Sequence, residues 1–263
     1  MPMPVPIVIP LFVFIFGALI GSFLNVCIYR IPEGKSIVSP PSHCPSCGEG
    51  VRWYDNIPIL SYLILRGKCR FCANRISVQY PLVELLTALA ALFFFLKFQL
   101  SIVFAILFIF TAALIVISFI DLEHRIIPDV ISLPGIIVGF VAALFLPEVG
   151  WMSSLIGILV GGGSLLLVAW VYQLLTRKEG MGGGDIKLLA MMGAFLGWRA
   201  IPFIIFASSL IGSVIGISVM LIQKKDSKFA LPFGPFLAIG ALIYIFFGSR
   251  IISWYLNFGA YGG

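Results

Sequence analysis

Long apolar runs take up most of this 263-residue sequence and constrain its fold more than any other feature. They cover residues 1–29, 82–96, 100–120, 130–147, 150–176, 186–198, 200–222 and 231–248. Most of them approach the length of about 20 residues that an α-helix needs to cross a bilayer. Only 11% of the residues are charged, roughly half of what a soluble domain carries. We therefore expect an all-α polytopic membrane protein with about eight transmembrane helices.

Two of these runs need separate treatment. Residues 1–29 contain no charged side chain, and they lack the basic start and short apolar core of a secretory signal peptide, so we expect a retained transmembrane helix. As a helix, residues 186–198 would extend only about 20 Å, short of a hydrocarbon core of about 30 Å. A short span and a re-entrant segment are the two alternatives for this run.

The placement of Lys and Arg predicts the orientation, because cytoplasmic loops collect basic residues. With eight spans and an N-terminus outside, the inner side holds Arg30, Lys35, Arg52, Arg66, Lys68, Arg70, Arg75, Arg125, Arg177, Lys178, Lys187, Lys224, Lys225 and Lys228. Only Lys97, Arg199 and Arg250 fall outside. A re-entrant sixth run would move three of the inner lysines outside, so a short span is favoured. The net charge of +6 fits this bias and anionic lipid on the inner leaflet, so we expect lipid and no nucleic acid as a partner.

Residues 30–79 differ in composition from the runs on either side, and we expect three parts: a first transmembrane helix at 1–29, a cytosolic domain at 30–79 and a seven-helix membrane domain at 80–255. The cytosolic part carries two C-x2-C pairs, Cys44 with Cys47 and Cys69 with Cys72. Four thiolates in two close pairs are typical of a structural zinc site, with no open position for substrate.

Other roles for the cysteines stay open, although disulfides rarely persist in the cytosol. A redox role or metal-free thiols are the alternatives to zinc, and His43 could replace one ligand. Cys27 lies in the first apolar run, where we expect it to be a packing residue.

Acidic residues at membrane depth are functional hypotheses because burying a carboxylate in lipid is costly. Asp121 ends the third run, and Asp185 follows Gly182, Gly183 and Gly184 at the start of the sixth. The charge pattern places both aspartates at the cytosolic end of the membrane. A pair of carboxylates can activate a water and protonate a leaving group, and the glycines would allow close backbone approach. Proton-coupled transport by the pair and purely structural roles, with Asp185 as a helix N-cap, are the alternatives.

The remaining polar residues near the membrane have less specific interpretations. Asp129 follows Pro128 and is expected to cap a helix, while Glu123 and His124 are expected to face water. Lys187 should point away from Asp185 on a helix. Glu84 lies among apolar residues, where it either pairs with a basic side chain or lines a second site.

Several ordered motifs together resemble one known family. The G-x-G-D motif at Gly182–Asp185, with Asp121 lying 64 residues upstream, is similar to that of bacterial type IV prepilin leader peptidases. The paired C-x2-C motifs match as well. So do the segments Gly21–Val26, Trp53–Pro58, Tyr80–Glu84 and Pro232–Phe236. The resemblance extends from about residue 17 to 240.

This resemblance implies a bifunctional enzyme of the bacterial inner membrane, serving type IV pili or type II secretion. Asp121 and Asp185 would act on a bound water to cleave the basic leader of a prepilin or pseudopilin, between a glycine and usually a phenylalanine. S-adenosylmethionine would then methylate the new N-terminus. The family places methylation with the cysteine loop and adjoining helices, so Glu84 and Trp53–Pro58 are the candidates. The rival hypotheses are a transporter and a membrane scaffold whose zinc module binds a partner.

Overall fold

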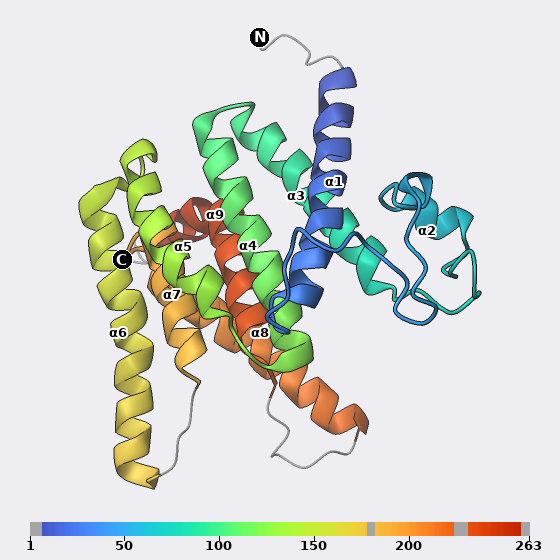
Figure 1. Cartoon of the computed structure of the whole chain (residues 1–263). Helices are drawn as coiled ribbons and strands as arrows, with labels where there is room; N and C mark the ends of the chain where they lie inside the picture. Colours follow the sequence, from blue (N-terminus) through green and yellow to red (C-terminus); the bar gives the residue numbers. More distant parts are fainter. Residues whose placement is uncertain (1–6, 178–181, 224–230, 259–263) are drawn as a thin grey trace. The chain divides into compact units, whose positions relative to one another are not determined.

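The computed structural model describes residues 7–177, 182–223 and 231–258, and within these ranges every regular element is helical (Figure 1). The α-helices are α1 (Val8–Arg30), α2 (Leu60–Ile64), α3 (Gln79–Phe98), α4 (Ile102–His124), α5 (Asp129–Ala142), α6 (Gly150–Thr176), α7 (Gly183–Leu196), α8 (Ala200–Gln223) and α9 (Gly234–Phe258). Two short 3-10 helices, η1 (Trp53–Asp55) and η2 (Ala143–Phe145), complete the set. The expected all-α fold is confirmed.

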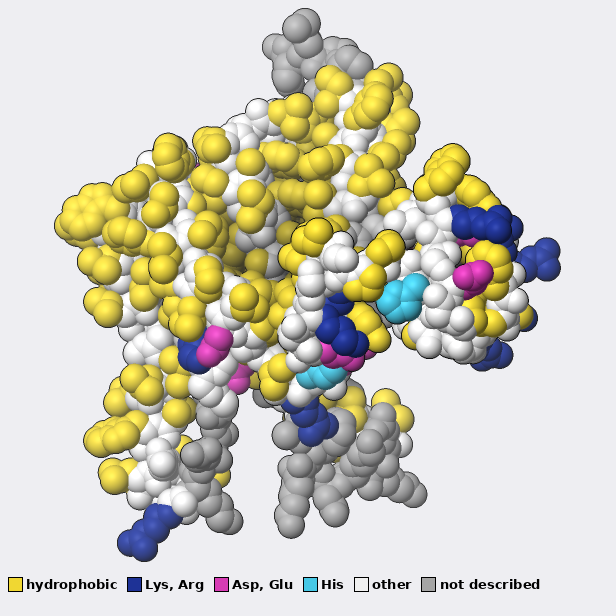
Figure 2. All heavy atoms as spheres, viewed as in Figure 1, with side chains coloured by type: hydrophobic (Ala, Val, Ile, Leu, Met, Phe, Trp, Pro, Cys, Tyr) yellow, Lys and Arg dark blue, Asp and Glu magenta, His cyan; other side chains and the backbone are white. Residues whose placement is uncertain are grey.

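Each predicted apolar run overlaps one helix of at least 14 residues. Among the described residues, six helices are long and apolar enough to cross a membrane, namely α1, α3, α4, α6, α8 and α9. The other two, α5 and α7, have 14 residues each, although η2 extends α5 to Phe145. Hydrophobic side chains cover most of the visible face (Figure 2). The chain is thus a multi-pass membrane protein, and a total of eight spans stays a prediction.

The chain divides into two compact units, residues 1–116 and 117–263, and α4 contributes to both. Four of the basic residues used to predict the orientation, Lys178, Lys224, Lys225 and Lys228, lie outside the described residues.

In the first unit, α1 packs against α3 through small residues. A side chain at Gly21 would come within 2.6 Å of the Cα atom of Glu84, and one at Gly17 within 2.8 Å of the Cα atom of Ala88. Glycine at these positions therefore lets the two backbones approach closely, as small residues do between membrane helices. Cys27 is buried in α1, as expected for a packing residue.

In the second unit, α7 packs against α5 and α6. Gly157 of α6 meets Gly193 of α7 so closely that a side chain at either position would overlap the backbone of the other. Gly139 of α5 similarly faces Phe195, where an added Cβ would be 2.6 Å from the ring. Residues 188–197 are consequently buried. Protein atoms therefore surround most of this short helix, while its first turn is part exposed.

Candidate functional site

The four cysteines of the C-x2-C pairs lie together in the first unit. Their sulfur atoms are all within 4.8 Å of one another, and the Cys44 and Cys72 sulfurs are 3.8 Å apart. None of the four forms a disulfide. His43 directs Nδ1 to the carbonyl oxygen of Pro41, 3.2 Å away. The predicted four-cysteine cluster is confirmed, and its four sulfurs are close enough to bind one metal ion.

The two C-x2-C segments have matching backbone turns. The Cys44 N–H donates to the Glu49 carbonyl at 2.9 Å, and the Cys69 N–H donates to the Asn74 carbonyl at 2.8 Å. Each turn needs a left-handed residue after its second cysteine, which is Gly48 in one turn (φ +72°) and Ala73 in the other (φ +54°). Glycine adopts this conformation without strain, so the sequence points to the first turn but not to the second.

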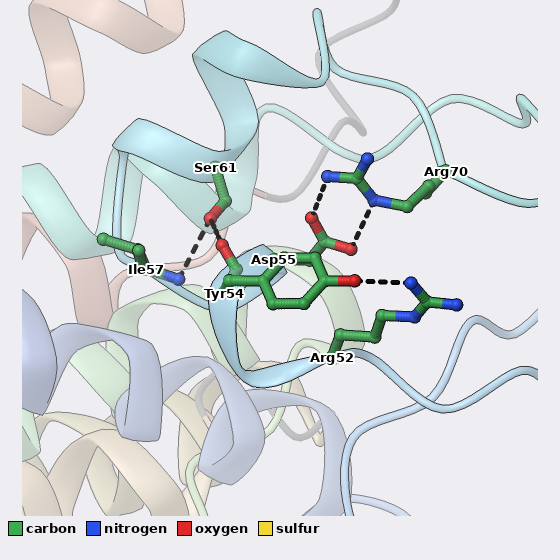
Figure 3. Close-up of polar contacts among 6 residues, drawn as sticks. All are labelled: Arg52, Tyr54, Asp55, Ile57, Ser61 and Arg70. Atoms are coloured by element: carbon green, nitrogen blue, oxygen red, sulfur yellow. Dashed lines mark hydrogen bonds and ion pairs between the residues drawn. The ribbon is translucent and has the colours of Figure 1, made fainter.

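A polar network connects η1, α2 and Arg70 (Figure 3). The guanidinium of Arg70 donates to both oxygens of Asp55 at 2.7 and 2.5 Å, and it also lies 5.4 Å from the centre of the Tyr54 ring. The Ser61 hydroxyl accepts the Ile57 N–H and donates to the Tyr54 carbonyl, both at 3.0 Å. These bonds join the Trp53–Pro58 segment to α2 and to the second cysteine pair.

Hydrogen bonds in the segment between α1 and α3 shift the pKa values of its ionisable groups. Backbone hydrogen bonds from Cys47 and Ser46 lower the pKa of the Cys44 thiol to about 6. A backbone hydrogen bond from Glu49 lowers the pKa of Cys47, but partial burial and the neighbouring sulfurs outweigh it and raise that pKa to about 11. The hydrogen bonds from Arg70 hold the pKa of Asp55 below its ordinary value. Neighbouring thiols resist ionising together unless a cation lies among them, which a metal ion would provide.

Glu84 is buried in α3 and is hydrogen-bonded to the segment that lies between α1 and α3. Its Oε2 accepts the N–H of Ile59 at 2.7 Å. Ile59 has φ +63°, an unusual conformation for a β-branched residue. Glu84 therefore stands next to the Trp53–Pro58 segment, and within the described residues the backbone N–H of Ile59 takes the place of the basic partner considered from the sequence.

Asp121 lies in the last turn of α4 and is buried, with 5% of its surface exposed. Its Oδ2 accepts the backbone N–H of Gly234, the first residue of α9, at 3.0 Å. The Arg125 N–H donates to its backbone carbonyl. Glu123 and His124 are exposed, as predicted.

Asp185 lies in the first turn of α7 and is half-buried. The helix begins at Gly183 with Gly182 as its N-cap residue, so the alternative in which Asp185 caps the helix is wrong. A side chain at Gly182 or Gly183 would meet no other part of the chain that the structure describes, whereas one at Gly184 would come within 2.8 Å of Ile127. Asp121 and Asp185 belong to the same unit and are near enough for their charges to interact.

An ion pair joins α5 to α7 beside Asp185. The Lys187 ammonium contacts both oxygens of Asp129, at 2.7 and 2.8 Å. The N-cap of α5 is Pro128, and no side chain caps that helix, so the prediction that Asp129 is a cap is wrong. Its carboxylate instead forms an ion pair with Lys187 of α7. Nothing local in the sequence signals this pair, because the two residues are 58 positions apart.

Comparison with known proteins places these residues in a family. The bacterial peptidase A24 N-terminal domain matches residues 15–98, and the type IV leader peptidase family matches residues 108–217. A prepilin leader peptidase/N-methyltransferase of Pseudomonas putida is 37% identical, with 91% of each chain covered.

The chain belongs to the type IV leader peptidase family.

Further relatives agree with this membership. The proteins of the same name from Pseudomonas aeruginosa and Aeromonas hydrophila are 37% and 38% identical, covering 97% and 93% of this chain and 96% and 93% of their own lengths. No solved structure matches the chain significantly. The first family match contains all four clustered cysteines and Glu84, and the second contains Asp121 and Asp185.

Proposed function

We propose that this protein cleaves the basic leader from type IV prepilins or pseudopilins and then methylates the new N-terminus. The main support is that relatives which cover nearly the whole chain are named prepilin leader peptidase/N-methyltransferase. These names favour the peptidase over the proton-coupled transporter and the scaffold. The inner bacterial membrane, with the N-terminus outside and both sites facing the cytosol, is the location that the distribution of Lys and Arg supports.

Asp121 and Asp185 are the proposed catalytic pair. One carboxylate takes a proton from water, whose oxygen attacks the carbonyl carbon of the scissile peptide. As the C–N bond breaks, the other carboxyl group gives its proton to the leaving nitrogen. Two carboxylates held close together favour one shared proton, which this division of roles requires. The open space at Gly182 and Gly183 leaves room for a substrate backbone beside Asp185.

Zinc is the metal that we propose for Cys44, Cys47, Cys69 and Cys72. Four sulfurs bonded to zinc at about 2.3 Å in a tetrahedron lie about 3.8 Å apart, and the Cys44–Cys72 separation is 3.8 Å. Four protein ligands leave no position for substrate, so the ion would stabilise the fold of the module. A segment of this size has little core of its own, and metal binding would contribute to its folding free energy.

The proposed methyl donor is S-adenosylmethionine, which supplies an electrophilic methyl group when bound. Glu84 and the Trp53–Pro58 segment are the candidates for holding the amine that receives it. Their support is proximity, because the residue after this segment, Ile59, is hydrogen-bonded to Glu84.

Mass spectrometry of a prepilin incubated with the purified protein, with and without S-adenosylmethionine, tests both activities. We expect loss of the leader in both samples and an added methyl group only with the donor. Asp121→Asn and Asp185→Asn should each abolish cleavage, while Glu123→Gln, exposed two residues from Asp121, should cleave normally. Cleavage at a near wild-type rate by either Asn variant would refute the role of that aspartate.

A further inference from the structure

The start of α9 makes a contact with Asp121 that the reaction scheme above does not use. Gly234 is the first residue of α9, and its N–H donates to Asp121 Oδ2 at 3.0 Å in a buried contact. The two residues are 113 positions apart, and both belong to the second unit. A buried N–H needs a partner, and here the partner is the carboxylate assigned to the chemistry.

In the first turn of α9, the N–H group that donates to Asp121 is that of Gly234. The first N–H groups of any α-helix have no partner within the helix. Pro235 has no N–H, and the N–H groups of Phe236 and Leu237 both donate to the Phe233 carbonyl at 3.1 Å. The Gly234 N–H is the remaining donor of the first turn, and it points at the carboxylate.

The missing side chain at Gly234 matters as much as its N–H. A Cβ atom there would lie 2.7 Å from Asp121 Oδ2 and 3.3 Å from Asp121 Cγ. The nearest atoms belong to the end of a side chain, not to backbone, so an added methyl group would displace the carboxylate rather than separate the helices. Gly234 does not have a positive φ, so alanine fits the backbone there.

The geometry points to Gly234 as a positioning residue for the proposed peptidase reaction: its N–H holds Asp121 Oδ2, and its lack of a side chain keeps the carboxylate in place. This inference rests on the proposed function.

Kinetics of three glycine variants test this inference in the full-length protein in lipid nanodiscs. Gly234→Ala should lower kcat for leader cleavage by about 100-fold with KM unchanged, since a misplacement of about 1 Å at a reacting group has such an effect. Gly216→Ala is the matched control, because among the described residues its Cβ would meet Leu231 alone, at an ordinary 3.4 Å, and it should cleave normally. Gly240→Ala crowds the Ile204 carbonyl of α8 at 3.0 Å and should lower the melting temperature with kcat retained.

A kcat for Gly234→Ala within about threefold of wild type would overturn the inference. It would also be overturned if Gly234→Ala and Gly240→Ala had the same melting temperature and lost the same fraction of kcat. A second measurement does not depend on activity. In the spectrum of ¹⁵N-glycine-labelled protein, Asp121→Ala should move the Gly234 amide proton upfield, while Asp129→Ala should leave it in place. An unmoved Gly234 signal would show that the contact does not exist. If both Asn variants cleaved normally but this signal moved, the proposed function would fail while the contact stood.

Discussion

At the residue scale, the ion pair of Asp129 and Lys187 ties α7 to α5, and Lys187 lies two residues after Asp185. Lys187→Asp or Asp129→Lys alone places like charges together and should slow cleavage about fivefold, the rate equivalent of about 1 kcal/mol. The double variant should recover most of the rate. Both side chains are part exposed, at 37% for Lys187 and 56% for Asp129, so thermal stability should change little. A double variant as slow as the single ones would contradict this role.

Arg30 is the second residue whose contacts predict an effect away from the proposed chemistry. It is buried at the end of α1, where its guanidinium donates to the Ser36 carbonyl at 2.9 Å and to the Pro40 carbonyl at 2.6 Å. Lysine lacks the planar fork that reaches both acceptors. Arg30→Lys should therefore reduce stability by about 1.5–3 kcal/mol and speed hydrogen exchange in residues 31–44. The exposed Arg66→Lys should do neither, and equal exchange in both variants would refute the prediction.

At the element scale, the contact between Gly157 of α6 and Gly193 of α7 sets how α7 is held. The clash for an added side chain is with backbone on both sides, so neither helix can relieve it by a rotamer change. We expect Gly157→Ala to lower the free energy of unfolding by about 1–3 kcal/mol, as overpacked cores do, and to reduce cleavage. Gly163→Ala in the same helix meets open space and should melt like wild type. Equal melting temperatures for the two variants would count against this packing.

The same helix shows what the sequence can and cannot predict. Apolar runs and cysteine spacing are local patterns, and they predicted the six long helices, the two shorter helices α5 and α7, and the four-cysteine cluster. The predicted start of α7, at residue 186, is three residues too late. Glycine disfavours helix, and yet Gly183 and Gly184 lie inside the first turn. The contacts of Asp121 with Gly234 and of Asp129 with Lys187 join residues far apart in the chain. Periodicity within one helix contains no information about such pairs, so they required the fold.

At the scale of the whole molecule, the cysteine cluster and the proposed aspartate pair fall in different compact units. Groups in different units are expected to respond separately when one unit is perturbed. A metal bound by the four cysteines would support the segment between α1 and α3 more than it would support the helices of the second unit, which pack against one another.

Metal removal should therefore affect the two proposed activities unequally. Cys44→Ser and Cys69→Ser should each lower the bound zinc and loosen residues 40–75, since a missing thiolate leaves the metal with an incomplete ligand set. Methylation of a leaderless pilin should fall with the zinc content, because Glu84 holds Ile59 of the same module. Leader cleavage should fall less, and a Cys27→Ser control in α1 should retain its zinc. Metal analysis combined with hydrogen exchange and the two activity assays measures these effects. Unchanged zinc in both Cys44→Ser and Cys69→Ser would exclude these cysteines as zinc ligands.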